Sequence, residues 1–375
     1  VGPWTDLYAV GRVATAWLFT VGEGDERTPR FVLPDGVRLW IARMTRQSVS
    51  ERLRHAAEAA AELAALDGDR DVVVGWQPLV EHSDFTPPPI GLRGAGAALV
   101  SQRRWPVLGR EALKVRLWDL LGDVVRDGRS RWVVLRGAAG VGKRSLARWL
   151  AEQAAEAAVA TFVDAVPSVD EACRKWEARH DPCAERRDPG PIGTLRILEH
   201  AAAQRPVVLC CERIERGLVL LAGPLRAAPI LVLVAHDTDE SHDEQPLEEL
   251  EAVVALQQLV VPALAEPDHY RLLVDHVGLD NATARHVVAR APGNPAFTLA
   301  TVADWIRSGS LTASPTGLVI RGMAIPPIPS DQAENWRLRL DSLALGHDHL
   351  DALRGAAVLG GRVRLSEWEA LVPGL

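Results

Sequence analysis

The stretch Trp132-Val-Val-Leu-Arg-Gly137-Ala-Ala-Gly140-Val141-Gly142-Lys143-Arg144-Ser145 decides the fold of this chain. Residues 132–135 are an apolar run typical of a buried parallel strand. The glycines and Lys143 then follow the spacing G-x-x-x-x-G-K, in which backbone N–H groups curl inward around phosphate oxygens. A helix predicted over 143–157 places its positive N-terminal end at the same point. Together these features predict a nucleotide phosphate site, for ATP or ADP, that contains Gly137, Gly140, Val141, Gly142, Lys143, Arg144 and Ser145.

One position departs from this motif. The residue after the lysine is normally Ser or Thr, whose hydroxyl binds Mg²⁺, but here it is Arg144. Ser145 follows one residue later, and one residue along a helix is a rotation of about 100°, so Ser145 does not replace the missing ligand. We therefore expect a weakened Mg²⁺ site in which Arg144 pairs with a phosphate and replaces part of the metal's charge.

Composition limits the class of protein. A chain of 375 residues predicts two or three domains. Its net charge of −7 gives no sign of a nucleic-acid-binding surface, and we expect no membrane segment and no secretory signal. The four cysteines lack metal-binding spacing, which favours reduced thiols and a cytoplasmic location. The scarcity of lysine beside arginine suggests a bacterial origin, and the start at Val1 suggests a piece of a longer polypeptide.

A second candidate motif follows the loop helix. The strand predicted over 205–212 carries apolar residues and then an acid, the pattern that delivers a carboxylate to a metal or an attacking water. Glu212 is therefore a candidate catalytic and metal-binding residue. The sequence leaves open whether Glu212 holds the second acidic position, with Cys211 in the first, or is itself the acid on the metal side.

The alternation of strands and helices predicts a parallel three-layer α/β sheet over 106–262, with ligands at the carboxyl ends of its strands. Helices are expected at 266–277, 280–290 and 295–307, and a hairpin at 309–321, as a helical lid over 263–322. Residues 323–375 are predicted to begin a winged-helix domain. The acidic run 237–251 is expected to be a solvated loop and helix start.

Residues 106–375 resemble the AAA+-like signal-transduction ATPases known as the STAND group. The matching elements are Pro106–Glu111, the glycine loop, the acid-ended strand, the strand that ends at His236, and Gly293-Asn294-Pro295. The resemblance implies that His236 senses the terminal phosphate and that Pro295 lies by the nucleotide base. It also implies protein partners or self-assembly into an oligomer.

Residues 1–66 resemble the C-terminal end of the protein-kinase large lobe. Asp6, Tyr8 and Gly11 match its D-x-Y-x-x-G pattern, and Arg52 matches an arginine that follows a short loop. An ordinary helical bundle is the alternative. In this resemblance the kinase catalytic residues are absent from the chain, and Asp6 is expected to be a buried acceptor without its usual partner. Residues 67–105 are rich in charge, glycine and proline and are predicted to form a linker.

Three functions remain open. The first is an ATP-binding regulatory module of a bacterial serine/threonine protein kinase, a signalling switch with slow hydrolysis and at most weak ATPase activity. The second is a scaffold for protein–protein interaction that binds no nucleotide. The third is the ATPase module of a transcription regulator.

Overall fold

The structure is a computed structural model of the chain. It describes residues 3–21, 27–29, 34–49, 52–53, 55–66, 105–165, 168–180, 190–238, 245–291, 293–314, 317–321, 334, 337, 340–341, 346–359 and 365–371. These residues form two compact units. The first holds the described residues up to Leu272 together with Gly293–Pro295, and the second holds the described residues of 273–291 and 296–371. Each unit is considered by itself.

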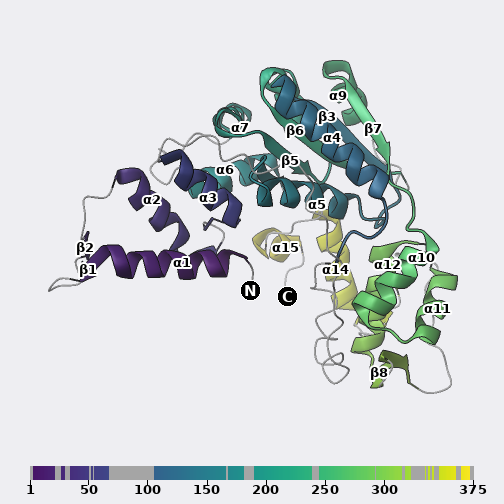
Figure 1. Ribbon diagram of the computed structural model, residues 1–375. Coiled ribbons are helices and arrows are strands. Elements are labelled where there is room, and N and C mark those ends of the chain that lie inside the picture. The colour runs from purple at the N-terminus through teal and green to yellow at the C-terminus, as the bar shows by residue number, and fades with distance from the viewer. Residues whose placement is uncertain are drawn as a thin grey trace. The chain divides into compact units, whose positions relative to one another are not determined.

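A five-stranded parallel sheet forms the centre of the first unit (Figure 1). Its strands are β3 (Arg131–Gly137), β4 (Thr161–Ala165), β5 (Val207–Cys211), β6 (Ile230–Asp237) and β7 (Leu256–Val260). They lie in the order β4-β5-β6-β3-β7, and each neighbouring pair is parallel. The predicted parallel α/β sheet is therefore confirmed. The strand order places β3, which leads into the glycine loop, between β6 and β7.

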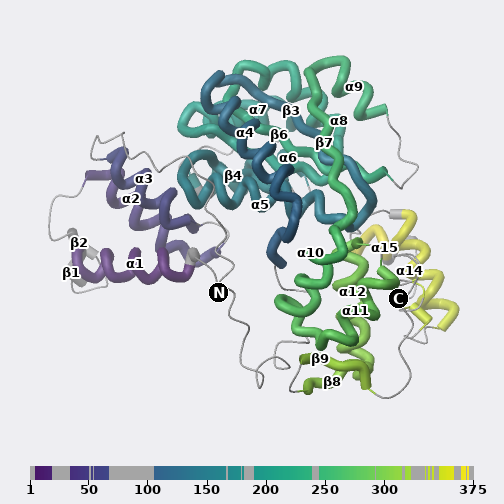
Figure 2. Tube along the Cα trace, turned by 45° about the vertical axis from the view of Figure 1, so that its right-hand side comes forward, coloured from purple at the N-terminus to yellow at the C-terminus, as the bar shows by residue number. Residues whose placement is uncertain are grey.

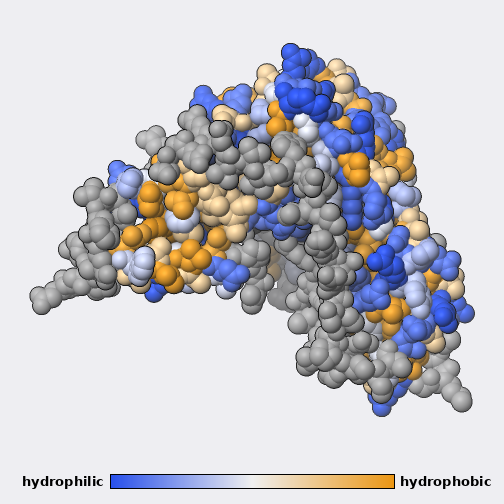
Figure 3. All heavy atoms as spheres, in the orientation of Figure 1, coloured by the Kyte–Doolittle hydropathy of each residue, from blue (hydrophilic) through white to orange (hydrophobic). Residues whose placement is uncertain are grey.

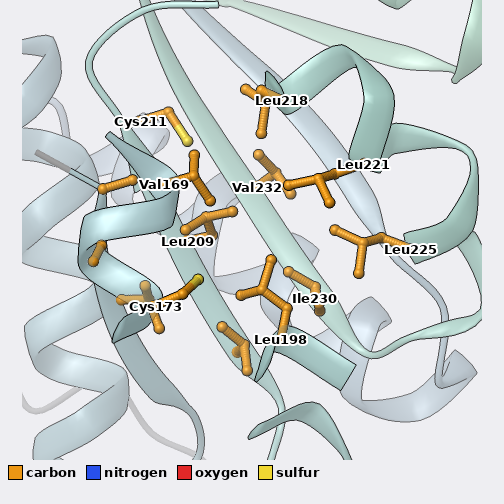
Figure 4. Close-up of a cluster of buried hydrophobic side chains, with 14 of the residues drawn as sticks. Val169, Cys173, Leu198, Leu209, Cys211, Leu218, Leu221, Leu225, Ile230 and Val232 are labelled. Carbon is orange, nitrogen blue, oxygen red and sulfur yellow. The ribbon is translucent and has the colours of Figure 1, made fainter. Parts of the chain in front are cut away.

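Helices cover both faces of this sheet. The helices of the first unit around it are α4 (Glu111–Asp127), α5 (Lys143–Glu156), α6 (Val169–His180), α7 (Pro191–Gln204), α8 (Arg216–Ala222), the short η4 (Pro224–Ala227), α9 (Gln245–Val253) and α10 (Glu266–Arg271). On one face, α4 and α5 pack on a core that includes Val133 and Leu233. On the other face, α6, α7 and α8 pack on Leu209, Val232 and their neighbours (Figure 4).

Successive side chains along a strand point to opposite faces of the sheet, so each strand contributes to two separate cores. Val133 and Leu135 of β3 belong to the α4–α5 side, whereas Trp132 belongs to the other side. Because both faces of the inner strands are covered, β5, most of β6 and the middle of β3 are continuous apolar runs, whereas the edge strands β4 and β7 also carry polar residues.

Three further helices precede the sheet in the chain. They are α1 (Pro3–Leu18), α2 (Asp35–Met44) and α3 (Ala56–Leu66), and the short strands β1 (Phe19–Val21) and β2 (Arg27–Pro29) pair between the first two. Their own small core contains Leu7, Ile41 and Met44. Asp6 is exposed, so the expectation that it is a buried acceptor is wrong. It lies on the solvent side of α1, one residue before the buried Leu7.

The helix expected at 266–277 is divided between α10 in the first unit and the π-helical segment that follows it, and the other helices expected for the lid lie mostly in the second unit. After α10 come the π-helical η5 (Leu272–Val277), α11 (Asn281–Arg290) and α12 (Pro295–Arg307), followed by the hairpin of β8 (Leu311–Ser314) and β9 (Gly317–Ile320) (Figure 2). Asp280 caps α11, because its carboxylate accepts hydrogen bonds from the N–H groups of Ala282 and Thr283. The last helices are α14 (His347–Leu359) and α15 (Leu365–Leu371).

Two predicted features lie largely outside the described residues. The linker 67–105 is described only at Trp105, and much of the predicted winged-helix region between 322 and 346 is not described. Among the residues that are described, no helix has both the length and the apolar character that crossing a membrane requires.

Candidate nucleotide-binding site

The carboxyl ends of β3, β6 and β7 converge on the glycine loop. In the parallel register Gly137 pairs with Asp237, and the N–H of Thr238 donates a hydrogen bond of 3.1 Å to the carbonyl of Gly137. On the other edge, the N–H of Val261 donates a bond of 2.7 Å to the carbonyl of Arg136. The loop therefore leaves the sheet from a strand that is held on both sides.

The glycines of the loop are required by its conformation. Gly140 and Gly142 have φ angles of 81° and 99°, which residues with side chains rarely adopt. A Cβ atom on Gly142 would lie 2.9 Å from Nη1 of Arg110, and one on Gly137 would lie 2.5 Å from the carbonyl oxygen of Val261. Close packing around the backbone therefore excludes side chains at two of the predicted phosphate-binding positions.

Three polar side chains hold carbonyl groups of the loop. Nζ of Lys143 donates to the carbonyls of Gly137 and Ala138 at 2.7 and 2.6 Å. Nδ2 of Asn294 donates to the carbonyl of Ala139 at 2.6 Å, and Nη2 of Arg110 donates to the carbonyl of Val141. In a planar trans peptide the carbonyl and the following N–H point in opposite directions. Each of these bonds therefore fixes the direction of the N–H that follows the bonded carbonyl, and this N–H points away from the side chain that donates the bond.

Arg110 reaches the loop from the segment that precedes α4. Its backbone has a φ of 68°, an uncommon left-handed conformation for a residue other than glycine. The guanidinium also donates to the carbonyl of Pro262 at 3.1 Å, so it joins the loop to the residues after β7. Burial lowers the pKa of Arg110.

Lys143 is buried and pairs with an acid from the neighbouring strand. Its side chain is 5% exposed, and Nζ lies 2.5 Å from Oδ1 of Asp237. Asp237 is the last residue of β6 and belongs to the acidic run that was expected to be solvated. Its contact with Lys143 was missed, although it follows from two facts: β6 adjoins β3, and Asp237 alternates with His236 along the strand.

Arg144 occupies the position of the usual magnesium ligand and forms an ion pair with Glu212. Nη1 of Arg144 lies 2.6 Å from Oε1 of Glu212, and the two side chains are 51% and 45% exposed. The structure thus joins the two positions at which the sequence indicated a departure from the motif. Ser145 is exposed on the first turn of α5.

The residues at the carboxyl end of β5 lie on alternate faces of the sheet. Sγ of Cys210 lies 3.5 Å from the carbonyl of Ala147 on α5, whereas Cys211 lies in the core on the opposite face, near Val169 and Leu218 (Figure 4). Glu212 follows on the side of Cys210, where it meets Arg144. Burial raises the pKa of both cysteine thiols. Of the two alternatives left open by the sequence, this placement puts Glu212, and not Cys211, on the side of the glycine loop.

The remaining candidate residues are placed as follows. His236 is partly buried, and strand alternation directs it to the side of Val232 and Val234, away from Asp237. Pro295 begins α12 directly after Asn294, the residue that holds the loop. Gly293 has a φ of 63°, and its carbonyl accepts a 2.7 Å bond from the N–H of Leu264. The Gly293–Pro295 segment is thus tied to the first unit.

The residues present do not fit a Mg²⁺ ion bound in the usual way. The guanidinium of Arg144 lies at the position where a hydroxyl ligand is needed, and it is paired with the carboxylate of Glu212. A cationic side chain repels a divalent cation, and Arg cannot lose its proton in a protein.

Comparison with known proteins gives only distant similarity. No protein-family model and no curated protein matches this sequence. Among solved structures, the Aeropyrum pernix ORC1 protein in complex with DNA is 14% identical, with a TM-score of 0.46 over 73% of this chain and 79% of that one. The ORC2 protein of the same organism, in ADPNP–ADP complexes, is 14% identical with a TM-score of 0.44 over 73% and 81%. Cdc6p from Pyrobaculum aerophilum is 14% identical with a TM-score of 0.43 over 73% and 82%.

Proposed function

We propose that this chain binds ATP or ADP at the glycine loop and acts as a nucleotide-dependent switch with slow or absent hydrolysis. The observation that carries the proposal is the loop itself. It is a G-x-x-x-x-G-K loop between a buried strand and a helix N-terminus, and four of its carbonyls are held by Lys143, Asn294 and Arg110. Such a loop offers N–H donors and a positive helix end to phosphate oxygens.

Two ion pairs hold the cations beside the glycine loop. Lys143 is neutralised by Asp237, and Arg144 is neutralised by Glu212. An incoming phosphate competes with both carboxylates, because lysine and arginine are the cations that a nucleotide phosphate seeks. Binding therefore releases two acids at the ends of β5 and β6. That exchange of partners is the physical basis of the proposed switch.

Slow hydrolysis follows from the same contacts. Fast phosphoryl transfer to water needs a metal ion on the phosphates and a carboxylate or other group that orients the water. Glu212 is the carboxylate available at the end of β5, but it is paired with Arg144. Cys211 is buried on the other face and supplies no acid. We expect the nucleotide to stay bound unhydrolysed for longer than in a motor ATPase.

Asn294 connects nucleotide binding to the following helix. It donates to the carbonyl of Ala139 in the loop, and α12 begins at the next residue. A phosphate that shifts the Ala139 peptide therefore alters the anchor of α12. This supports a switch of the STAND type, in which nucleotide controls the helical segment after the sheet.

We further propose that the module belongs to a bacterial serine/threonine protein kinase. The support is the N-terminal segment, in which the guanidinium of Arg52 lies 4.2 Å from the centre of the Tyr8 ring, so that two of the residues behind the kinase resemblance are in contact. α1 also exposes Val10, Val13 and Trp17, and hydrophobic residues gather on the surface of the N-terminal helices in Figure 3, as they do when further protein covers a helix. The coding sequence before Val1 tests this directly, because it should contain a kinase catalytic loop.

Calorimetric titration of the whole chain with ATP and ADP, each with Mg²⁺ and with EDTA, tests the nucleotide proposal. We expect binding of similar strength in both conditions, and loss of binding in Lys143→Ala. Lys175→Ala is the matched control, because Lys175 is a half-exposed lysine paired with Glu171 on α6. Folded protein that binds neither nucleotide would overturn the proposal and favour the scaffold.

A further inference from the structure

We propose that Glu58, Glu62 and His180 form a binding site for a divalent transition-metal ion, for which Zn²⁺ is the best match. The site lies in the first unit, where it joins α3 to the end of α6. It is separate from the glycine loop and does not depend on the proposed nucleotide binding.

The fold brings three metal-binding side chains together. Glu58 and Glu62 are four residues apart on α3 and therefore lie on one face of the helix. His180 is the last residue of α6. One ligand atom from each of the three side chains lies within 4.8 Å of the others. The side chains are 13%, 23% and 10% exposed, so the group is largely removed from water.

The imidazole of His180 is oriented for metal binding. Its Nδ1 lies 2.9 Å from the carbonyl oxygen of Trp176. A carbonyl only accepts, so Nδ1 carries the proton. The Trp176 ring also stacks on the imidazole, with centroids 4.3 Å apart and planes 14° from parallel. Nε2 is thereby aimed at Glu58. A histidine that donates Nδ1–H to a carbonyl and presents Nε2 is the usual arrangement of a metal ligand.

The distance between Nε2 of His180 and Oε1 of Glu58 is compatible with both atoms binding one ion. It is 3.2 Å, which without an ion is an ordinary hydrogen-bond distance. Two ligands held at about 2.05 Å from a tetrahedral zinc ion are about 3.3 Å apart. The observed spacing is therefore close to one edge of a zinc coordination tetrahedron.

Arg43 orients the second carboxylate of the group. It makes a two-pronged contact with Glu62, with Nη–Oε distances of 2.7 and 3.0 Å. Each oxygen of Glu62 retains a second lone pair for a metal. One nitrogen and two oxygen donors suit Zn²⁺, with water at a fourth position.

A small pocket gives access to the site. Glu58 and His180 line it together with Arg52, Leu53 and His55 from the N-terminal segment and with Thr161 and Phe162 of β4. Next to it, Nη1 of Arg46 donates to the carbonyl of Ala178 at 3.1 Å. A bound ion would thus strengthen an existing contact between the N-terminal helices and the sheet domain.

The test is calorimetric titration of chelator-treated full-length protein with Zn²⁺, followed by Co²⁺ substitution to record the visible absorption of the bound ion. Glu58→Gln and His180→Gln each remove one ligand at nearly constant size. His200→Gln is the matched control, because His200 is exposed and meets the same Trp176 ring edge-on at 6.2 Å. Circular dichroism shows which variants are folded.

We expect one Zn²⁺ per chain, affinity at least about 100-fold weaker in each folded ligand variant, and unchanged affinity in His200→Gln. The Co²⁺ complex should show the intense bands of a four-coordinate site. Absence of binding, or binding that survives Glu58→Gln, overturns the proposal. In that case the 3.2 Å contact between Nε2 and Glu58 is a hydrogen bond within the protein.

Discussion

Arg144 and Glu212 are joined across the site by a distance of 2.6 Å between Nη1 and Oε1. One comes from the first turn of the loop helix and the other from the end of β5. In nucleotide sites of this fold these two places hold ligands of Mg²⁺. Here the two side chains form an ion pair with each other.

Replacing Arg144 by serine should restore dependence on magnesium. Arg144→Ser supplies a hydroxyl after the lysine and frees Glu212, so both usual ligands become available. We expect Mg²⁺ to strengthen ATP binding at least tenfold in this variant and to have little effect on the unmodified protein, as measured by calorimetry. Arg148→Ser removes another arginine of α5, which is paired with Asp164 of β4, and should behave like the unmodified protein. Equal magnesium dependence in both variants would contradict the argument.

Removing the acid beside the loop lysine should strengthen nucleotide binding. In Asp237→Asn the phosphate no longer competes with a carboxylate for Lys143. We expect the dissociation constant for ATP to fall about tenfold, which corresponds to about 1.4 kcal/mol. Glu248→Gln removes an exposed charge from the same acidic run and separates this local effect from the general loss of negative charge. Weaker binding in Asp237→Asn would show that the ion pair orders the site instead of competing for it.

A methyl group on Gly142 should abolish binding. Gly142→Ala combines a φ of 99° with a Cβ only 2.9 Å from Arg110, so the loop and the guanidinium both have to move. Gly128→Ala is the control, because Gly128 has a φ of 65° and no atom within 4 Å of an added Cβ. Both variants should lose about 1–2 kcal/mol of stability through backbone strain. Only Gly142→Ala should lose nucleotide binding, measured with a fluorescent nucleotide analogue.

The unfolding free energy should fall below about pH 6.5 because of His269. This side chain on α10 is 1% exposed, and burial lowers its pKa. The unfolded chain therefore takes up the proton first, at its ordinary pKa near 6.5. Stability is complete above that pH and decreases as the pH falls toward the folded value, by at most about 1.4 kcal/mol per pH unit. Urea titrations between pH 8 and 5 should show a shallower decrease in His269→Gln, and an unchanged slope would show that other groups cause it.

The thiol of Cys173 should be nearly inert in the folded protein. Burial, followed by the charges of Asp170 and Glu177, raises its pKa from 9.0 to about 12. At pH 8 the thiolate fraction is then about a thousandfold lower than for an ordinary cysteine. Iodoacetamide labelling read by mass spectrometry should modify this residue only after unfolding. Fast labelling under native conditions would mean that the core around α6 opens readily.

The sequence was sufficient for the sheet and for the loop. Continuous apolar runs marked the strands, because both faces of the sheet are buried, and the glycine spacing marked the loop before Lys143. The partner of Lys143 was not predictable from local pattern, since Asp237 looks like the first member of a solvated acidic run. Only the adjacency of β3 and β6, which are far apart in the chain, brings it to the lysine.

The faces of the sheet that Cys210 and Cys211 occupy could not be predicted from the sequence either. Cys210 and Cys211 are both small and apolar, so neither indicates which face of the sheet it occupies. The packing of Cys211 on Val169 and Leu218 decides the matter and turns Glu212 toward the loop helix. The contact of Arg110 with Val141 depends on a left-handed backbone at Arg110, for which the sequence gives no signal beyond the preceding Gly109.

The sheet separates the glycine loop from the helices that pack on its opposite face. The loop, Lys143, Arg144 and Asp237 all lie on the side of α4 and α5 or at the strand ends, whereas α6, α7 and α8 pack on the opposite face. Changes in the outer surfaces of α7 and α8 therefore leave the glycine loop and the two ion pairs beside it in place. Substitutions on that side can accumulate without altering the geometry of the loop.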